Sequence, residues 1–316
     1  MSARPILGAA VDLGSNSVHL LVAEVEGHQL RPVIDESAFL GLGAAVDDRA
    51  HLGAGARGEL VTTLQRYVST AHLMGATTVT LMGTEPIRRA ADGARIVAEI
   101  EVGTGVHLHV LSHEEEAFLT LIGVTEGRPV NQETLVVDIG GGSSEFCAVG
   151  PTGHARAAGL RLGSDRLTNR HARGDPPSLA DVAGMTAAAD VALADAMTGH
   201  PREIVIVGGT ASNLLKVAPG GTSDTILTRE RLASALITLL ERPAAETSQR
   251  FGVNLKRARL LPAGATIVDA LLRRYGATQV RVSHAGMREG AILIADHVGR
   301  SWRDRLASMA HGWRVD

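Results

Sequence analysis

The stretch "LVVDIGGGSSEF", residues 135–146, is an apolar run that ends in one aspartate and three consecutive glycines before apolar residues resume. A glycine-rich turn exposes backbone N–H groups to anions, and an aspartate at the end of a strand is a suitable ligand for a divalent cation. Phosphate together with a metal ion is therefore the first hypothesis for this segment. The alternative is an ordinary tight hairpin in which glycine only supplies positive φ.

The N-terminal stretch "AAVDLGSNSVHLLVAEV", residues 9–25, repeats the same pattern. In both stretches an apolar strand leads into Asp, an apolar residue, Gly and a small polar turn, and a second apolar strand follows. Asp12 thus matches Asp138, and Gly14 matches Gly140. Both stretches predict β-hairpins, and their recurrence in the two halves of the chain predicts a duplicated architecture.

Strand and helix patterns alternate after each hairpin, which predicts an α/β fold. The expected helices lie near 56–74, 179–198, 229–241 and 257–275, and the expected strands at 77–83, 106–112, 203–209 and 279–286. The Pro/Gly-rich segment 127–132 is the natural domain boundary. The basic segment "NLKRAR", residues 254–259, is interpreted as a solvated helix face.

Composition restricts the classes of function. The 316 residues are 45% hydrophobic and 21% charged, which allows two sizeable cores. A net charge of −3 gives no general attraction for nucleic acid or for an anionic membrane, so we expect neither as a partner. The single cysteine, Cys147, excludes an intramolecular disulfide, and no apolar run approaches the roughly 18 residues of a membrane span. These features predict a cytoplasmic protein.

Two hairpins that face each other would form a phosphate clamp, with one glycine-rich turn on each wall of an interdomain cleft. Asp12 and Asp138 would bind Mg²⁺ directly or through its water molecules. The phosphate-binding residues expected in the turns are Gly14, Ser15, Asn16, Ser17, Gly140, Gly141, Gly142 and Ser143. The sequence thus predicts Mg²⁺ as the cofactor.

A third anion site is expected at "VIVGGTASNLLK", where a strand ends at Gly208, Gly209 and Thr210 and a helix follows. Helix N-termini bind phosphate through free N–H groups and the helix dipole. The alternative is that Thr210 only caps its helix.

Seven motifs, spread in order from residue 9 to residue 292, carry a resemblance to a known family. They are "AAVDLGSNSVHLLVAEV", "TEPIRRA", "SHEEEAFLTLIGV", "VVDIGGGSSEF", "LRLGSDRLT", "VGGTASN" and "AGMREGAI". Together they resemble the exopolyphosphatase and guanosine pentaphosphate phosphohydrolase family. The resemblance implies the actin, hexokinase and Hsp70-type ATPase superfold, with two duplicated ribonuclease-H-like domains and an interdomain cleft.

The resemblance also implies a catalytic glutamate that activates the attacking water, and its motif places this residue at Glu116. The neighbouring acids have structural explanations. Ser112 and Glu115 form a capping-box pattern, and Glu114 favours the helix dipole. A solvated carboxylate in the first helical turn is the alternative for Glu116.

The family's arginine four residues after a threonine corresponds to Arg88 after Thr84, and the resemblance implies that both handle the phosphoryl group. Glu85 and Pro86 depart from the smaller residues usual between them, and Arg89 is the competing arginine. Glu145 matches an acid that can complete the metal site, although an outward-facing strand position would also explain it.

The sequence ends about twenty-five residues after "AGMREGAI" and contains no His-Asp dipeptide, so it resembles the short, two-domain form of the family. The expected domains are residues 1–126 and 127–297, with segment 298–316 packing back onto the first. The sequence is compatible with a homodimer and does not decide between a monomer and a dimer.

The implied reaction is Mg²⁺-dependent hydrolysis of terminal phosphoanhydride bonds of inorganic polyphosphate, with release of orthophosphate. Guanosine pentaphosphate (pppGpp) is the nearest alternative substrate, which would connect the chain to the stringent response. A sugar or carboxylate kinase and a nucleotide-gated scaffold of the same superfold are the alternatives from other classes.

Overall fold

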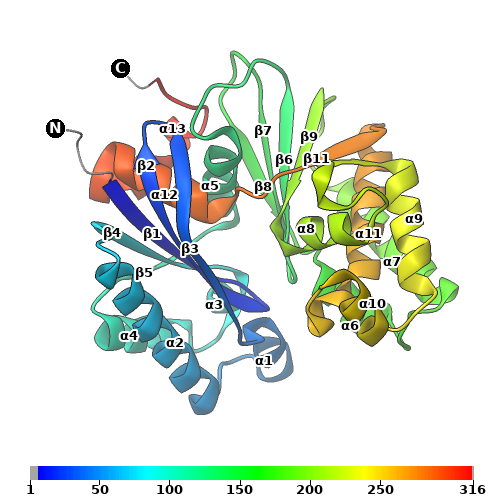
Figure 1. Cartoon of the computed structure of the whole chain (residues 1–316), viewed down its shortest axis with the longest axis horizontal. Coiled ribbons are helices and arrows are strands. Elements are labelled where there is room, and N and C mark those ends of the chain that lie inside the picture. The colour runs from blue at the N-terminus through cyan, green and yellow to red at the C-terminus, as the bar shows by residue number, and fades with distance from the viewer. Residues whose placement is uncertain (1–5, 315–316) are drawn as a thin grey trace. The chain divides into compact units, whose positions relative to one another are not determined.

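The structure, a computed structural model, describes residues 6–314, which divide into two compact units (Figure 1). Unit 1 runs to Val130 and also takes Thr152–Ala155 and the chain from Ala285 onward. Unit 2 consists of Asn131–Pro151 and Arg156–His284. Each unit has its own sheet and its own hydrophobic core.

The sheet of unit 1 has the strand order β3-β2-β1-β4-β5. Its strands are β1 (Ile6–Leu13), β2 (Ser17–Glu26), β3 (Gln29–Phe39), β4 (Thr78–Gly83) and β5 (Leu108–Val110). The first three form an antiparallel meander, and β4 and β5 continue the sheet in parallel to β1. Residues 9–25 therefore form the predicted hairpin.

Helices cover both faces of this sheet. They are α1 (Leu42–Arg49), α2 (Ala54–Leu73), α3 (Glu85–Arg89), α4 (Gly93–Thr104), α5 (His113–Thr125), α12 (Met287–Val298) and α13 (Trp302–Met309), with the 3-10 turn η2 (Gly299–Ser301). The core on one face joins β1 to α2 and α4, and the core on the other joins β1 to α5, α12 and α13. Because side chains alternate along a strand, Asp12 lies on the same face of β1 as Ala10, which packs in the α5 and α12 core.

The sheet of unit 2 has the strand order β10-β11-β9-β6-β7-β8. Its strands are β6 (Thr134–Ile139), β7 (Ser144–Val149), β8 (Arg156–Leu160), β9 (Glu203–Val207), β10 (Ile226–Thr228) and β11 (Gln279–Val282). Its helices are α6 (Ser164–His171), α7 (Leu179–Ala194), α8 (Gly208–Val217), α9 (Arg229–Leu240), α10 (Ala244–Phe251) and α11 (Leu255–Tyr275), with the 3-10 turn η1 (Gly221–Ser223). The long helix α11 supplies a large part of the core.

The two sheets repeat one topology. In unit 2 the antiparallel meander β6-β7-β8 is followed by β9 and β11 in parallel to β6, as β1-β2-β3 is followed by β4 and β5 in unit 1. The antiparallel edge strand β10 is the addition in unit 2. The predicted fold class, an α/β protein with two duplicated actin-like (ribonuclease-H-like) domains, is confirmed.

The last helix of the chain packs in the core of unit 1. Trp302 and Leu306 of α13 are only 3% and 1% exposed, and they lie in one cluster with Leu111 and Leu119. Within residues 6–314, no helix combines the length and the apolar character that crossing a membrane requires.

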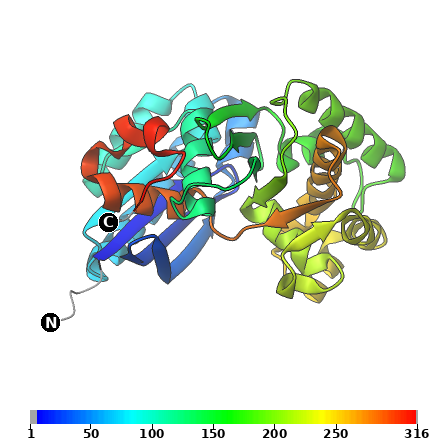
Figure 2. The same ribbon diagram turned by 90° about the horizontal axis from the view of Figure 1, so that it is seen from above.

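Helices α5 and α12 pack side by side at very short range (Figure 2). A Cβ atom on Gly290 of α12 would lie 1.8 Å from the Leu119 carbonyl oxygen, and one on Gly123 of α5 would lie 1.9 Å from the Gly286 carbonyl oxygen. Gly290, the second glycine of the motif "AGMREGAI", therefore permits contact between the two helix backbones.

Gly290→Ala should force these helices apart and lower the free energy of unfolding by about 1–3 kcal/mol, the usual cost of overpacking. Gly58→Ala is the matched control, because Gly58 lies in α2 with open space around it. Alanine there should be neutral or should stabilise by up to about 1 kcal/mol. Urea denaturation of both variants measures the difference, and equal stabilities would contradict the close-packing argument.

Candidate active site

The turn of the unit 1 hairpin follows Asp12 and has its carbonyl groups bound by the start of α1. The Gly14 N–H donates to the Ser17 carbonyl over 3.1 Å. The Asn16 carbonyl accepts from the Leu40 and Gly41 N–H groups, and the Ser15 carbonyl accepts from Gly43. In a trans peptide the C=O and N–H groups point in opposite directions, so these bonds turn the following N–H groups away from α1.

The turn of the unit 2 hairpin repeats this arrangement. The Gly140 N–H donates to the Ser143 carbonyl over 3.0 Å. The Gly140 carbonyl accepts from the Ser164 N–H, and the Gly141 carbonyl accepts from the next two N–H groups at the start of α6. Among the described residues, the N–H groups of Gly141, Gly142 and Ser143 donate to no protein acceptor. The turn therefore offers three backbone donors to an anion.

Two residues that the sequence analysis did not single out hold this turn. A Cβ atom on Gly163 would lie 2.1 Å from the Gly141 carbonyl oxygen, so only glycine allows the start of α6 to reach the turn. The Arg166 Nε group donates to the Gly142 carbonyl over 2.9 Å. The motif "LRLGSDRLT" contains both residues, and this motif was the available signal.

Two carboxylates lie opposite each other in the unit 2 hairpin. Asp138 of β6 pairs with Glu145 of β7, and directly opposed residues project from the same face with Cβ atoms about 4.5–5.5 Å apart. Glu145 is 4% exposed, and burial raises the pKa of Asp138 to about 6. Carboxylate oxygens are the ligands that a hard divalent cation such as Mg²⁺ prefers, and here two carboxylates project from one face. The residues therefore fit a metal ion.

The equivalent position in unit 1 differs. Asp12 of β1 pairs with His19 of β2, so this hairpin carries one acid and one histidine where unit 2 carries two acids. The charge of Asp12 also acts on the guanidinium of Arg288, whose Nη1 lies 2.6 Å from Asp35 Oδ1. A cation thus already lies near Asp12, whereas burial alone accounts for the shift at Asp138.

The third predicted anion site, at the start of α8, lies next to Asp138. Gly208 has φ of +94°, and a Cβ atom there would lie 2.7 Å from Asp138 Oδ1. The alternative that Thr210 caps the helix is wrong, because the N-cap is Val207 and the Thr210 hydroxyl donates to Ser164 Oγ over 3.2 Å. The first N–H groups of α8 have no partner within the helix.

An arginine from α11 lies against the same glycines. A Cβ atom on Gly209 would lie 1.7 Å from Arg257 Nη1, and burial lowers the pKa of this guanidinium. The interpretation of "NLKRAR" as a solvated helix face is therefore wrong at this residue, although Lys256 and Arg259 are exposed. The helical period and the charges of the sequence did not separate the half-buried Arg257 from its exposed neighbours.

In unit 1, Arg88 and Glu116 contact each other directly. Arg88 Nη1 lies 2.5 Å from Glu116 Oε1, and the same guanidinium donates to the Leu111 carbonyl. His113 lies 3.0 Å from Arg88 Nη2, and burial together with the Arg88 charge lowers its pKa. Glu116 is 7% exposed, which disagrees with the alternative of a solvated carboxylate. His113 was not singled out in the sequence.

The competing arginine has different partners. Arg89 Nε donates to Glu85 Oε1 over 2.8 Å, and its guanidinium also pairs with Asp47. The Ser15 hydroxyl donates to Glu85 Oε2 over 3.4 Å, so Glu85 links Arg89 to the turn of the first hairpin. The contacts of Arg89 are therefore those of a structural residue.

Thr84 and Pro86 shape the loop before Arg88. Thr84 is the N-cap residue of α3, and its hydroxyl donates to the Leu13 carbonyl over 2.9 Å. Pro86 lies at the start of α3, where the missing N–H group costs nothing. The larger residues of "TEPIR" are thus accommodated in a regular helical turn that ends at Arg89.

The capping box at the start of α5 is confirmed. The Ser112 hydroxyl accepts from the Glu115 N–H, and the Glu115 carboxylate accepts from the Ser112 N–H over 2.7 Å. Glu115 also pairs with Arg303 of α13. The two adjacent glutamates therefore have separate arginine partners.

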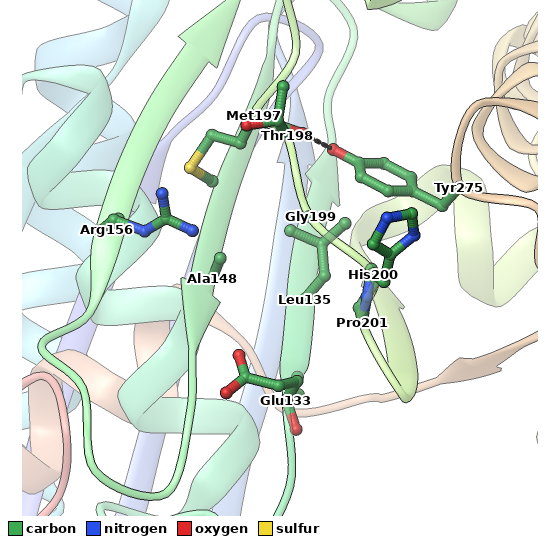
Figure 3. A pocket seen from close by; sticks show the side chains of 11 residues that line it. Glu133, Leu135, Ala148, Arg156, Met197, Thr198, Gly199, His200, Pro201 and Tyr275 are labelled. Carbon is green, nitrogen blue, oxygen red and sulfur yellow. Dashed lines mark hydrogen bonds between the residues drawn. The ribbon is translucent and has the colours of Figure 1, made fainter.

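Unit 2 also contains a pocket at the start of β6 (Figure 3). Asp138 lies near the other end of this strand. Arg156 and Glu133 lie at its edge, and the hydroxyl of Tyr275 donates to the Met197 carbonyl over 2.8 Å. None of the predicted site residues lines this pocket.

A family model described as the Ppx/GppA phosphatase family matches residues 21–297. The chain belongs to the Ppx/GppA phosphatase family. The match includes Arg88, Glu116 and Asp138, and the chain is an enzyme of this family.

Proteins with two different enzyme names are similar to this chain. Exopolyphosphatase 1 of Mycobacterium leprae is 28% identical over 301 residues, which cover 90% of this chain and 87% of that protein. The Guanosine-5'-triphosphate,3'-diphosphate pyrophosphatase of Aeromonas hydrophila is 26% identical over 318 residues, 98% of this chain and 64% of that protein.

Solved structures of the family have the same fold. The crystal structure of the Aquifex aeolicus family member matches with a TM-score of 0.80 and 25% identity, over 92% of this chain and 97% of that one. An exopolyphosphatase from Cytophaga hutchinsonii matches with a TM-score of 0.80 at 20% identity, which shows the fold alone.

The raised pKa of Asp138 gives a prediction for stability. Without metal, the folded protein holds this proton more tightly than the unfolded chain, so the contribution of Asp138 is present below about pH 4 and is lost as the pH rises through about 6. Asp138→Asn should remove this loss, and its thermal midpoint above pH 6 should equal or exceed that of the wild type. Added Mg²⁺ should raise only the wild-type midpoint, by a few degrees.

Scanning calorimetry across this pH range, with EDTA or with Mg²⁺, measures both effects. Asp195→Asn is the control, since Asp195 is an exposed acid of unit 2 and should leave the response to pH and to Mg²⁺ unchanged. Equal stabilisation of wild type and Asp138→Asn by Mg²⁺ would remove Asp138 from the metal site.

Proposed function

We propose that the chain is an exopolyphosphatase, which hydrolyses the terminal phosphoanhydride bonds of inorganic polyphosphate with Mg²⁺ and releases orthophosphate. The observation that carries this proposal is the ion pair between Arg88 and Glu116 in unit 1. It joins a group suited to a phosphoryl oxygen with a group suited to a water molecule. Relatives named exopolyphosphatase 1 over nearly the full chain support it.

In this reaction Glu116 orients the attacking water and accepts its proton. A carboxylate held by a guanidinium at 2.5 Å is a poor base, so the pair must loosen before Glu116 can act. A phosphate group that binds Arg88 would replace Glu116 Oε1 as an acceptor of the guanidinium. Substrate binding would thereby release Glu116, and the base would be freed only when a phosphoryl group is present.

The glycine turns bind the charged substrate oxygens in this proposal. The N–H groups of Gly141, Gly142 and Ser143 face away from α6, and Arg257 adds a half-buried cation beside Gly209. The equivalent turn of unit 1, Gly14–Ser17, closes with the same hydrogen bond, from the Gly14 N–H to the Ser17 carbonyl. A chain of phosphates provides many equivalent oxygens, which suits donors that are mostly backbone groups without base-specific contacts.

Asp138 and Glu145 in unit 2, and Asp12 in unit 1, are the residues that would hold Mg²⁺. When bound, the ion would neutralise phosphate oxygens and make the terminal phosphorus easier to attack. The chain's own contribution is the pair of opposed acids, which supplies carboxylate oxygens, the ligands that Mg²⁺ prefers.

Hydrolysis of guanosine pentaphosphate is the second candidate. The name of the Aeromonas hydrophila relative, which matches 98% of this chain, favours it. Both substrates present a terminal phosphoanhydride to the same groups. The proposal therefore predicts the same catalytic residues for both, and only rates can rank them.

The experiment is phosphate release by the purified protein with Mg²⁺, from polyphosphates of graded length and from guanosine pentaphosphate in parallel. The wild type should release phosphate from polyphosphate at the higher kcat/KM. Glu116→Gln keeps the size of the side chain but cannot accept the proton, so kcat should fall on the order of 10²- to 10⁴-fold while polyphosphate binding persists.

Glu114→Gln is the control, because Glu114 is exposed and only one residue from the capping box. It should leave kcat unchanged. Release from guanosine pentaphosphate alone would replace the first proposal by the second. Full activity of Glu116→Gln on both substrates would refute the assignment of the base.

The two adjacent arginines provide a further prediction. Arg88→Ala should raise KM and lower kcat, because it removes a charge-assisted bond to the transferring phosphoryl group, worth about 1.5–3 kcal/mol. Arg89→Ala should lower the thermal midpoint more than the activity, since its partners are Glu85 and Asp47. Steady-state kinetics combined with thermal melts separate the two, and the reverse pattern would move the phosphate contact to Arg89.

A further inference from the structure

Two arginines hold the turn between β5 and α5 in unit 1. From α3, Arg88 donates to the Leu111 carbonyl and to Glu116. From α13, Arg303 donates to the Val110 carbonyl over 2.8 Å and to both carboxylate oxygens of Glu115, over 2.5 and 2.9 Å. The two arginines thus hold the start of α5 on both sides. They bind the carbonyls of two consecutive residues before the helix and the carboxylates of two consecutive glutamates in its first turn.

The anchor of Arg303 is rigid. The preceding residue, Trp302, is 3% exposed and meets His109 of β5 edge-on at 5.1 Å between ring centroids. Leu306, one turn later, is 1% exposed in the cluster that contains Leu111. Because the core fixes α13, the Arg303 guanidinium starts from a defined backbone position, unlike that of an exposed arginine on a free helix.

The two carboxylates leave the helix in different directions. Successive residues of an α-helix are about 100° apart around the axis, and here Glu115 pairs with Arg303 while Glu116 pairs with Arg88. Glu115 accepts from Ser112 through the capping box and from Arg303 at the same time. Loss of Arg303 leaves the capping box intact but frees the turn on the α13 side.

We propose that Arg303 is a positioning residue for Glu116. Through the Val110 carbonyl and Glu115 it sets the orientation of the first turn of α5, and with it the direction of the Glu116 carboxylate. The C-terminal helix thereby contributes to the geometry of the reaction without touching substrate. This inference rests on the proposed role of Glu116 as the base.

Arg303→Met tests it, because methionine keeps an apolar stem and removes every donor. A misplacement of about 1 Å can cost up to about a hundredfold in rate, so a partly freed turn should lower kcat on the order of tenfold with KM changed less than about twofold. Amide hydrogen exchange of residues 111–116 should accelerate. Arg303→Lys should recover part of kcat, because one charged donor remains.

Arg305→Met is the matched control on the same helix, since Arg305 is exposed and has no ion pair within the described residues. It should change neither kcat nor exchange. In the Glu116→Gln background, Arg303→Met should cause no further loss of kcat, because the group that it positions is already disabled.

An equal loss of kcat in both backgrounds would show a general structural defect and would overturn the inference. Unchanged kcat and exchange in Arg303→Met would overturn it as well. A wild type without phosphate release would refute the proposed function instead, and hydrogen exchange of residues 111–116 would still decide whether Arg303 fixes the turn.

Discussion

A planar peptide directs its C=O and N–H groups in opposite directions, and the candidate site depends on this constraint. In unit 2 the carbonyls of Gly140, Gly141 and Gly142 are all bound by the start of α6, so the three N–H groups that follow are turned outward. The turn is therefore rigid before any anion arrives. Preorganised donors cost no reorganisation on binding, which is why backbone turns of this kind suit phosphate.

This constraint explains which parts of the site the sequence could predict. Both hairpins were predicted from Asp, Gly and the apolar flanks, because these features are local. The groups that hold the unit 2 turn, Gly163 and Arg166, lie more than twenty residues further along the chain, and their role follows only from contact in the folded unit. Strand β3 was not predicted either, because Pro32 and the charged residues around it do not show the alternation of a buried strand.

Charge was the least predictable feature. Arg257 and its exposed neighbours look alike in sequence, yet in the structure Arg257 is half-buried and its guanidinium lies against Gly209. The capping box of α5 was predicted from Ser112 and Glu115 because its spacing is fixed by the helix itself. Arg303, the second partner of Glu115, lies 188 residues away, so no local pattern could reveal it.

Duplication has preserved the backbone of the hairpins more closely than their side chains. Both turns close with the same hydrogen bond, from Gly14 to Ser17 and from Gly140 to Ser143. The residue opposite the aspartate is His19 in unit 1 and Glu145 in unit 2. Positive charge from Arg288 lies near Asp12, whereas Asp138 faces a second carboxylate across the strand pair. Both turns thus keep the same closing hydrogen bond, while the side chain that faces the aspartate differs between the units.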